Sequence, residues 1–183
     1  MARIPYVTRE EVAPDALAEF DALTGYGPFA NLAGAMAHRA PILRNAARML
    51  AELKEEGVLP RRYLELSLVA VSLLNKCDYC VAHHGPMLSI QGLSEAGVQS
   101  LLDYQNHPEL DDVDKLVVEY AKQVTLDPNR TRDAIFERLR AVFSNDQIVE
   151  LTWRIALCGA FNRFNDVLQL EIEPEAEAKA SAA

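Results

Sequence analysis

The stretch from residue 63 to residue 84, YLELSLVAVSLLNKCDYCVAHH, decides the fold and also carries the most reactive side chains of the chain. Its beginning, residues 63–68, alternates apolar and polar positions as a half-buried strand does. The alternation stops at Leu68, whereas the apolar run continues to Leu74 and is longer than most strands. We therefore predict a buried helix here.

A second helix is expected after a break at Asn75 and Lys76. It is predicted to begin at or near Cys77 and to run to about residue 92. Pro86 falls inside it, removes one backbone N–H and crowds the carbonyl group four residues earlier. A kink or an early stop is therefore expected there.

On both sides of these two helices, apolar residues recur at the helical spacing of three and four residues. Ser144 and Gln147 form a capping box that opens a long helix to about residue 170, and Ser94 is a good N-cap for a helix to about residue 104. The fold class predicted is all-α, a single-domain bundle of about eight helices. It comprises an N-terminal arm (1–12), the helical domain (13–172) and an acidic, Ala-rich tail (173–183) expected to fray from Glu173.

Composition restricts the function classes. The 183 residues carry a formal net charge of −9, which disfavours nucleic acid and anionic membranes as partners. The N-terminus lacks an apolar run of signal-peptide length, and residues 64–74 are too short and polar to span a bilayer. We expect a soluble cytoplasmic protein, in which a close cysteine pair is more often redox-active or metal-binding than structural.

The candidate site consists of Cys77, Cys80, His84 and Glu65. The two cysteines are three residues apart, so on a helical turn both thiols lie on one side within reach of a disulfide. His84 follows Cys80 by four residues and can accept the thiol proton. Glu65 lies in the most apolar helix and, if the two helices form an antiparallel hairpin, could reach and orient His84.

The same residues allow other interpretations. A zinc site with Cys77, Cys80 and two of the histidines at positions 38, 83, 84 and 107 is conceivable, although structural zinc sites normally use two well-separated ligand pairs. His83 is expected to be exposed, and Glu65 could be an ordinary surface residue. Cys158 is expected to be a core thiol, with Trp153 and Phe161 also in the core.

Taken together, Glu65 followed by Cys77-x-x-Cys80-x-x-x-His84 resembles the alkyl hydroperoxidase D-like (AhpD-like) family of the carboxymuconolactone decarboxylase superfamily. The twelve-residue gap between the glutamate and the first cysteine is similar to that of the family. The segment 162–166, NRFND, resembles the peroxidase-related branch. The resemblance covers roughly residues 25–172. The best-studied branch has a further histidine between the cysteines, where this chain has Tyr79.

The resemblance implies an all-helical homo-oligomer, commonly a trimer or hexamer, and a thiol-dependent peroxidase without cofactor or metal. Cys80 would attack the peroxide, Cys77 would close the disulfide, and Glu65 and His84 would relay the proton. The helix dipole argument favours Cys77 as the attacking thiol instead. A dithiol or lipoyl protein would restore the thiols. The alternatives are a carboxymuconolactone decarboxylase-like lyase, independent of both cysteines, and a non-catalytic redox-sensing oligomeric module.

Overall fold

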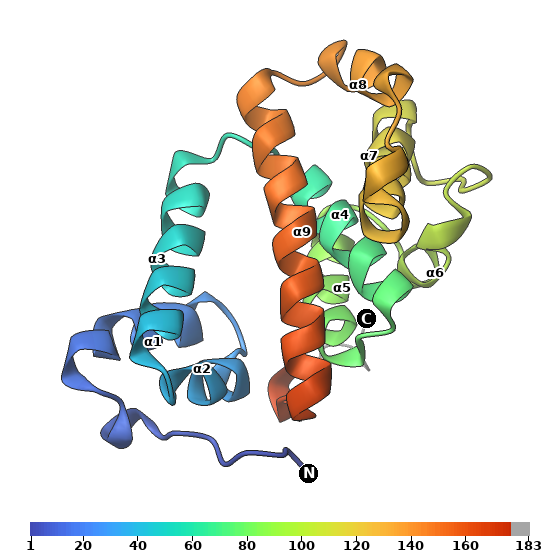
Figure 1. Ribbon diagram of the computed structural model, residues 1–183. Coiled ribbons are helices and arrows are strands. Elements are labelled where there is room, and N and C mark those ends of the chain that lie inside the picture. Colours follow the sequence, from blue (N-terminus) through green and yellow to red (C-terminus); the bar gives the residue numbers. More distant parts are fainter. Residues whose placement is uncertain (177–183) are drawn as a thin grey trace. The chain divides into compact units, whose positions relative to one another are not determined.

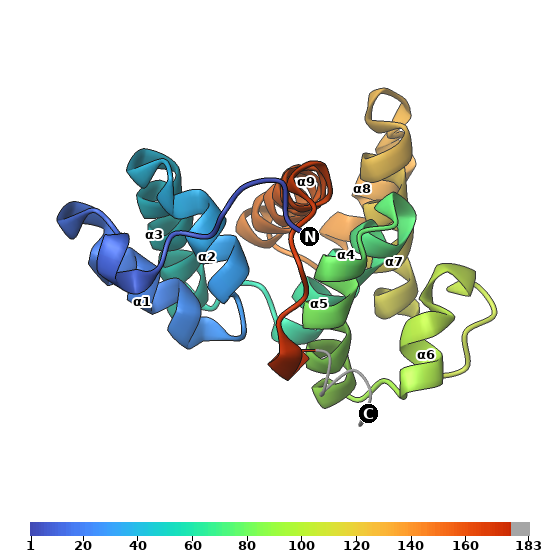
Figure 2. The ribbon, with the colours of Figure 1, turned by 90° about the horizontal axis from the view of Figure 1, so that it is seen from below.

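The structure is a computed structural model that describes residues 1–176 of the chain. The protein is 74% helical, and the described residues contain eight helices of seven or more residues and no strand, which confirms the all-α prediction. The described residues divide into two compact units, residues 1–57 with residues 165–176, and residues 58–164 (Figures 1 and 2). A single domain over 13–172 remains a prediction.

The first unit is built from three helices that pack on one another: α1 (Leu17–Tyr26), α2 (Ala30–Ala37) and α3 (Ala40–Glu56). Short 3-10 turns, Arg9–Glu11 and Pro14–Ala16, precede them. In the last turns of α1 the Thr24 hydroxyl donates to the carbonyl of Phe20 (3.0 Å). Gly57 ends α3 in the left-handed conformation, as glycine readily does.

Glu173 differs from the expectation of a frayed tail. Its side chain is buried, and its carboxylate accepts a hydrogen bond from the backbone N–H of Asn31 (2.8 Å) in the first turn of α2. The Asn31 amide also donates to the carbonyl of Glu171 (2.7 Å). An acidic side chain is stabilised at a helix N-terminus by unpaired N–H groups, so the fraying prediction is wrong at Glu173. Residues 177–183 of the predicted tail lie outside the described residues.

The second unit contains the remaining helices: α4 (Arg61–Asn75), α5 (Asp78–Ile90), α6 (Glu95–Gln99), α7 (Asp112–Leu126), α8 (Asp133–Arg140) and α9 (Asn145–Leu168), whose last four residues are grouped with the first unit. Helix α4 packs against both α5 and α7. Its apolar side chains are fully buried at Leu66, Val69 and Val71, which confirms the predicted buried helix.

Helix α6 is shorter than predicted. Ser94 caps it as expected, accepting from the N–H of Gly97 (3.0 Å), but the helix ends at Gln99 and a 3-10 turn, Leu101–Asp103, follows. Of the kink or early stop expected at Pro86, the early stop does not occur, because α5 continues four residues beyond it to Ile90.

One face of α9 corrects the prediction that Trp153 and Phe161 lie in the core. Trp153 is 48% exposed and Val149 is 68% exposed, and Phe161 is only partly buried. Apolar periodicity identifies which side chains favour burial but not which of them the rest of the chain covers. No helix in the described part of the chain has the length and apolar character that crossing a bilayer requires.

Candidate functional site

The turn between α4 and α5 positions the first cysteine. Lys76 adopts the left-handed conformation (φ 58°) and its N–H bonds to the carbonyl of Leu73 (3.2 Å), while the N–H of Cys77 bonds to the carbonyl of Ser72 (3.0 Å). These two bonds form a Schellman motif, which satisfies the last carbonyls of α4. The carbonyl of Cys77 then accepts from Val81 (3.1 Å), so Cys77 both follows α4 and caps α5.

Both cysteines of the pair lie at the beginning of α5. Cys77 is the N-cap residue and fully buried, and Cys80, in the first turn, is 6% exposed. The positive end of a helix dipole favours a thiolate at such positions. The structure places neither of them in a disulfide.

The structure brings Glu65 and His84 into direct contact. His84 Nδ1 lies 2.9 Å from Glu65 Oε2, across the packed helices α4 and α5. The carboxylate is completely buried, and the histidine side chain is 18% exposed. Because an ionised carboxylate can only accept, Nδ1 carries a proton and is the donor, and in the neutral form of the ring Nε2 is left without a proton. The ring nitrogen Nε2 is then the basic one, on the helix face that His84 shares with Cys80 four residues earlier.

Arg61 is a site residue that sequence reasoning missed. Its Nη2 lies 2.5 Å from the second carboxylate oxygen of Glu65, Oε1, one helical turn away on α4. A buried carboxylate requires a compensating charge, and the i, i+4 spacing of Arg61 and Glu65 is the signal that would have identified the pair.

His83 is buried, so the prediction of an exposed side chain is wrong. Its ring stacks on that of Tyr79, with centroids 4.2 Å apart, and its Nδ1 lies 2.6 Å from the backbone carbonyl of Tyr79. The residue between the cysteines therefore provides packing for His83, on a different face of α5 from His84.

Cys158 is a buried core thiol, as expected. Burial raises its pKa to about 12, so this thiol remains protonated at neutral pH. Its Sγ lies 3.5 Å from Ser72 Oγ, and the Asn162 amide lies 3.3 Å from the same hydroxyl and donates to it. The network continues to Asn75, whose amide donates to Asn162 Oδ1 (2.8 Å). These contacts link α9 to the end of α4 that precedes Cys77.

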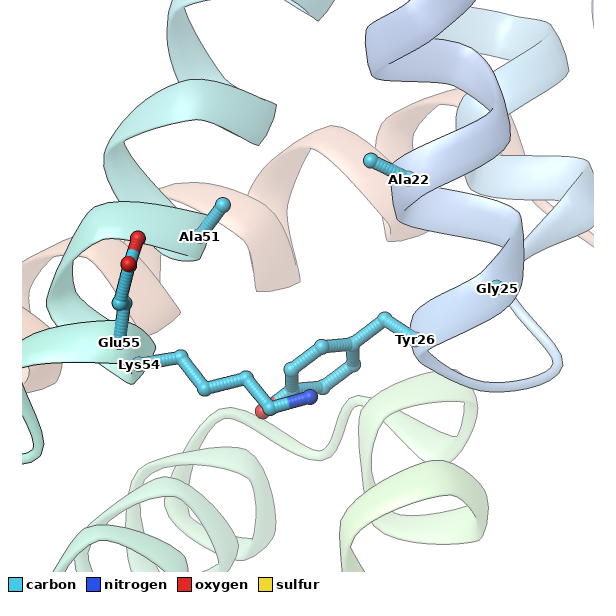
Figure 3. A pocket seen from close by; sticks show the side chains of 6 residues that line it. All are labelled: Ala22, Gly25, Tyr26, Ala51, Lys54 and Glu55. Atoms are coloured by element: carbon cyan, nitrogen blue, oxygen red, sulfur yellow. The ribbon is translucent and has the colours of Figure 1, made fainter.

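No group of three or more His, Cys, Asp or Glu side chains within residues 1–176 is arranged to hold a metal ion. One pocket, of about 340 Å³, lies in the first unit at the ends of α1 and α3 (Figure 3). Its principal feature is the Lys54 ammonium, 4.3 Å from the centre of the Tyr26 ring. It contains none of the four predicted site residues and offers neither a thiol nor an imidazole.

The fold and the site define an all-helical protein with a helix-borne thiol pair backed by a His–Glu hydrogen bond. Residues 40–105, which include all four predicted site residues, match the model of the Carboxymuconolactone decarboxylase family. The curated Escherichia coli (strain K12) protein YnjA, itself uncharacterized, is 27% identical over 121 residues, covering 62% of this chain and 66% of YnjA.

Two solved structures share the fold over nearly their whole length. An uncharacterized peroxidase-related protein with an alkylhydroperoxidase AhpD core, from Ralstonia eutropha JMP134, has a TM-score of 0.78 and 20% identity, covering 96% of this chain and 94% of its own. The debrominase Bmp8, in complex with 2,3,4-tribromopyrrole, has a TM-score of 0.81 and 16% identity, covering 100% and 99%. The segment 40–105 is similar to the carboxymuconolactone decarboxylase family, and the chain has the AhpD-like fold of these solved structures, in agreement with the resemblance drawn from the motif.

Proposed function

We propose that the protein is a thiol-dependent peroxidase of the alkyl hydroperoxide reductase type. The observation that carries the proposal is the 2.9 Å contact between Glu65 and His84 on the turn of α5 that follows the cysteine pair. A carboxylate behind a histidine fixes its tautomer and supports it as a base, and a base next to a thiol generates the nucleophile.

The proposed cycle uses only this chain's side chains, a peroxide and a dithiol. His84 takes the proton of the Cys80 thiol, and the thiolate attacks the peroxide so that the O–O bond breaks. Cys80 becomes a sulfenic acid, and the leaving alkoxide receives the proton from His84. The thiol of Cys77 then displaces water from Cys80 and forms the disulfide, and a dithiol or lipoyl protein reduces it by exchange.

The burial of the sulfurs supports Cys80 as the attacking residue. Cys80 is 6% exposed and lies one turn from His84, whereas Cys77 is fully buried. The helix dipole favours a thiolate at Cys77, but a thiolate also requires access to the peroxide. Cys77 is therefore better suited to resolve the sulfenic acid than to attack.

The test is peroxide consumption by the reduced protein with dihydrolipoamide as reductant. Cys80→Ser is expected to abolish turnover. Cys77→Ser is expected to accumulate a sulfenic acid at Cys80 that dimedone traps in stoichiometric amount. Cys158→Ser is the matched control and should retain turnover, because its thiol is packed and protonated. Consumption that persists in Cys80→Ser would refute the proposal.

The same assay separates the alternatives. A lyase acting on a lactone acid would remain active after replacement of both Cys77 and Cys80. A redox sensor would change its assembly or partner binding on oxidation, with negligible turnover. A reductive dehalogenase would release bromide from a bromopyrrole, the kind of compound bound to Bmp8, and would do so in place of peroxide reduction.

We also propose that the protein acts in the cytoplasm as a homo-oligomer, a trimer or hexamer. The exposed Trp153 and Val149 on α9 support this proposal, because exposed large apolar side chains are typical of surfaces that are covered in an assembly. Sedimentation velocity of the wild type and of Trp153→Glu tests it. A wild type that sediments as a monomer would refute it.

A further inference from the structure

We propose that Arg61 is a positioning residue for the reaction proposed above. It keeps Glu65 ionised and offsets its negative charge, so that Glu65 orients the Nδ1–H of His84 without drawing the ring into the imidazolium form. Nε2 then remains the nitrogen that accepts the thiol proton. The kinetic consequence rests on the proposed function, whereas the consequence for the protonation of His84 does not.

The two oxygens of Glu65 have different partners. Oε2 lies 2.9 Å from His84 Nδ1 and Oε1 lies 2.5 Å from Arg61 Nη2. Apart from this ion pair, Oε1 has no hydrogen-bond partner among the described residues, and the side chain is completely removed from solvent. The guanidinium therefore provides the compensation that a buried carboxylate oxygen needs.

Without that cation, two changes of protonation can reduce the free-energy cost of the buried carboxylate charge. The carboxylate can take up a proton, which removes the acceptor that orients His84, or it can hold His84 as an imidazolium ion. Both outcomes prevent His84 from accepting a proton from a thiol. A guanidinium remains charged at every relevant pH, so Arg61 excludes both.

The position of Arg61 is unfavourable for a helix and therefore requires another reason. The first turn of α4 contains Arg61 and Arg62 and no acidic residue, although cations are disfavoured at helix N-termini. Each arginine meets a buried carboxylate: Arg61 meets Glu65, and Arg62 meets Asp114 of α7 (2.6 Å). Their exposures are also alike, 32% and 28%.

Arg62 is consequently a matched control, with the same side chain, helix turn and type of partner but no contact to Glu65 or His84 in its hydrogen bonds. The experiment compares Arg61→Gln, Arg61→Lys and Arg62→Gln, all in the reduced state and at a temperature where circular dichroism shows them folded. The first readout is kcat for peroxide reduction. The second is the tautomer of His84 from ¹⁵N NMR at pH 8, assigned with His84→Gln.

We expect Arg61→Gln to lower kcat by about tenfold or more, within the range of a lost general base, and to lose the uniform Nδ1–H tautomer. Arg61→Lys should regain most of both, and Arg62→Gln should keep the wild-type tautomer and a kcat within about twofold. A wild-type tautomer in Arg61→Gln, or an equal loss of kcat in Arg62→Gln, would overturn the inference. If the wild type consumes no peroxide, the proposed function fails and the tautomer alone decides the role of Arg61.

Discussion

Replacing Asp114 with asparagine tests how the second unit is held together. The Asp114 carboxylate is buried and accepts from Arg62 Nε (2.9 and 3.1 Å) and Nη2 (2.6 Å), as well as from the N–H of Asp111 (3.2 Å). Arg62 Nη1 also donates to the carbonyl of Gln91 (2.5 Å) at the end of α5. One guanidinium therefore joins the beginning of α4 and α7 to the end of α5.

The expected loss follows from these contacts. Breaking a fully buried ion pair costs about 3–5 kcal/mol, because the remaining charge has no partner. Arg62 is 28% exposed and keeps its bond to Gln91, so water and that carbonyl offset part of the cost. Asparagine also retains one acceptor oxygen. We expect the free energy of unfolding to fall by about 2–3 kcal/mol.

The assay is urea unfolding followed by the fluorescence of Trp153, the single tryptophan, which lies on α9 in the part of that helix grouped with the second unit. Glu119→Gln is the control on the same helix α7: its ion pair with Arg138 (2.9 Å) is exposed and is expected to contribute no more than about 1 kcal/mol. If the two variants lie within about 1 kcal/mol of each other, the pair between Arg62 and Asp114 does not hold the three helices together as argued.

Lys76→Gly should raise the free energy of unfolding by about 1 kcal/mol, because it removes a non-glycine residue from the left-handed conformation. Gly57→Ala places a non-glycine residue in that conformation and should lower the free energy of unfolding by a similar amount. Urea midpoints of both variants against the wild type test this. Iodoacetamide at pH 8 should modify Cys80 of the folded, reduced protein and spare Cys158, whose pKa burial raises to about 12; mass spectrometry that finds Cys158 modified as fast as Cys80 would contradict it. Hydrogen bonds from Ser94 hold the pKa of Glu109 below its ordinary 4.5, so the stability difference between wild type and Glu109→Gln should be fully present above pH 4.5 and should decline as the pH falls further. A stability difference between wild type and Glu109→Gln that grows as the pH falls would contradict this prediction.

The hairpin that carries the site was predictable because its signals are local. The apolar run was too long for a strand, and Asn75 and Lys76 marked the break that the Schellman motif now occupies. The positions of both cysteines were predictable too, because both lie at the beginning of the next helix. The contact between Glu65 and His84 was only permitted by the sequence, because it depends on the register between α4 and α5, which no local pattern determines.

The wrong predictions share a physical cause. His83 is buried by an aromatic stack with Tyr79, and Trp153 is exposed, although a histidine is expected outside and a tryptophan inside. Burial is a property of the surroundings as well as of the side chain. In a helix that is apolar on several faces, such as α9, the sequence predicts which side chains favour burial. It does not predict which other part of the chain packs against them.

The arginines at the beginning of α4 show where such reasoning can be extended. A cation in the first turn of a helix opposes the dipole, and in this chain two occur in succession. Two successive arginines in a helix's first turn indicate that another part of the fold compensates their unfavourable position. Here each arginine is paired with a carboxylate that is buried from solvent. The acid paired with Arg62 joins helices, whereas the acid paired with Arg61 also holds an imidazole. A buried glutamate in an apolar helix should therefore be examined together with the residue one turn before it, because the charge that compensates it also determines what its second oxygen can do.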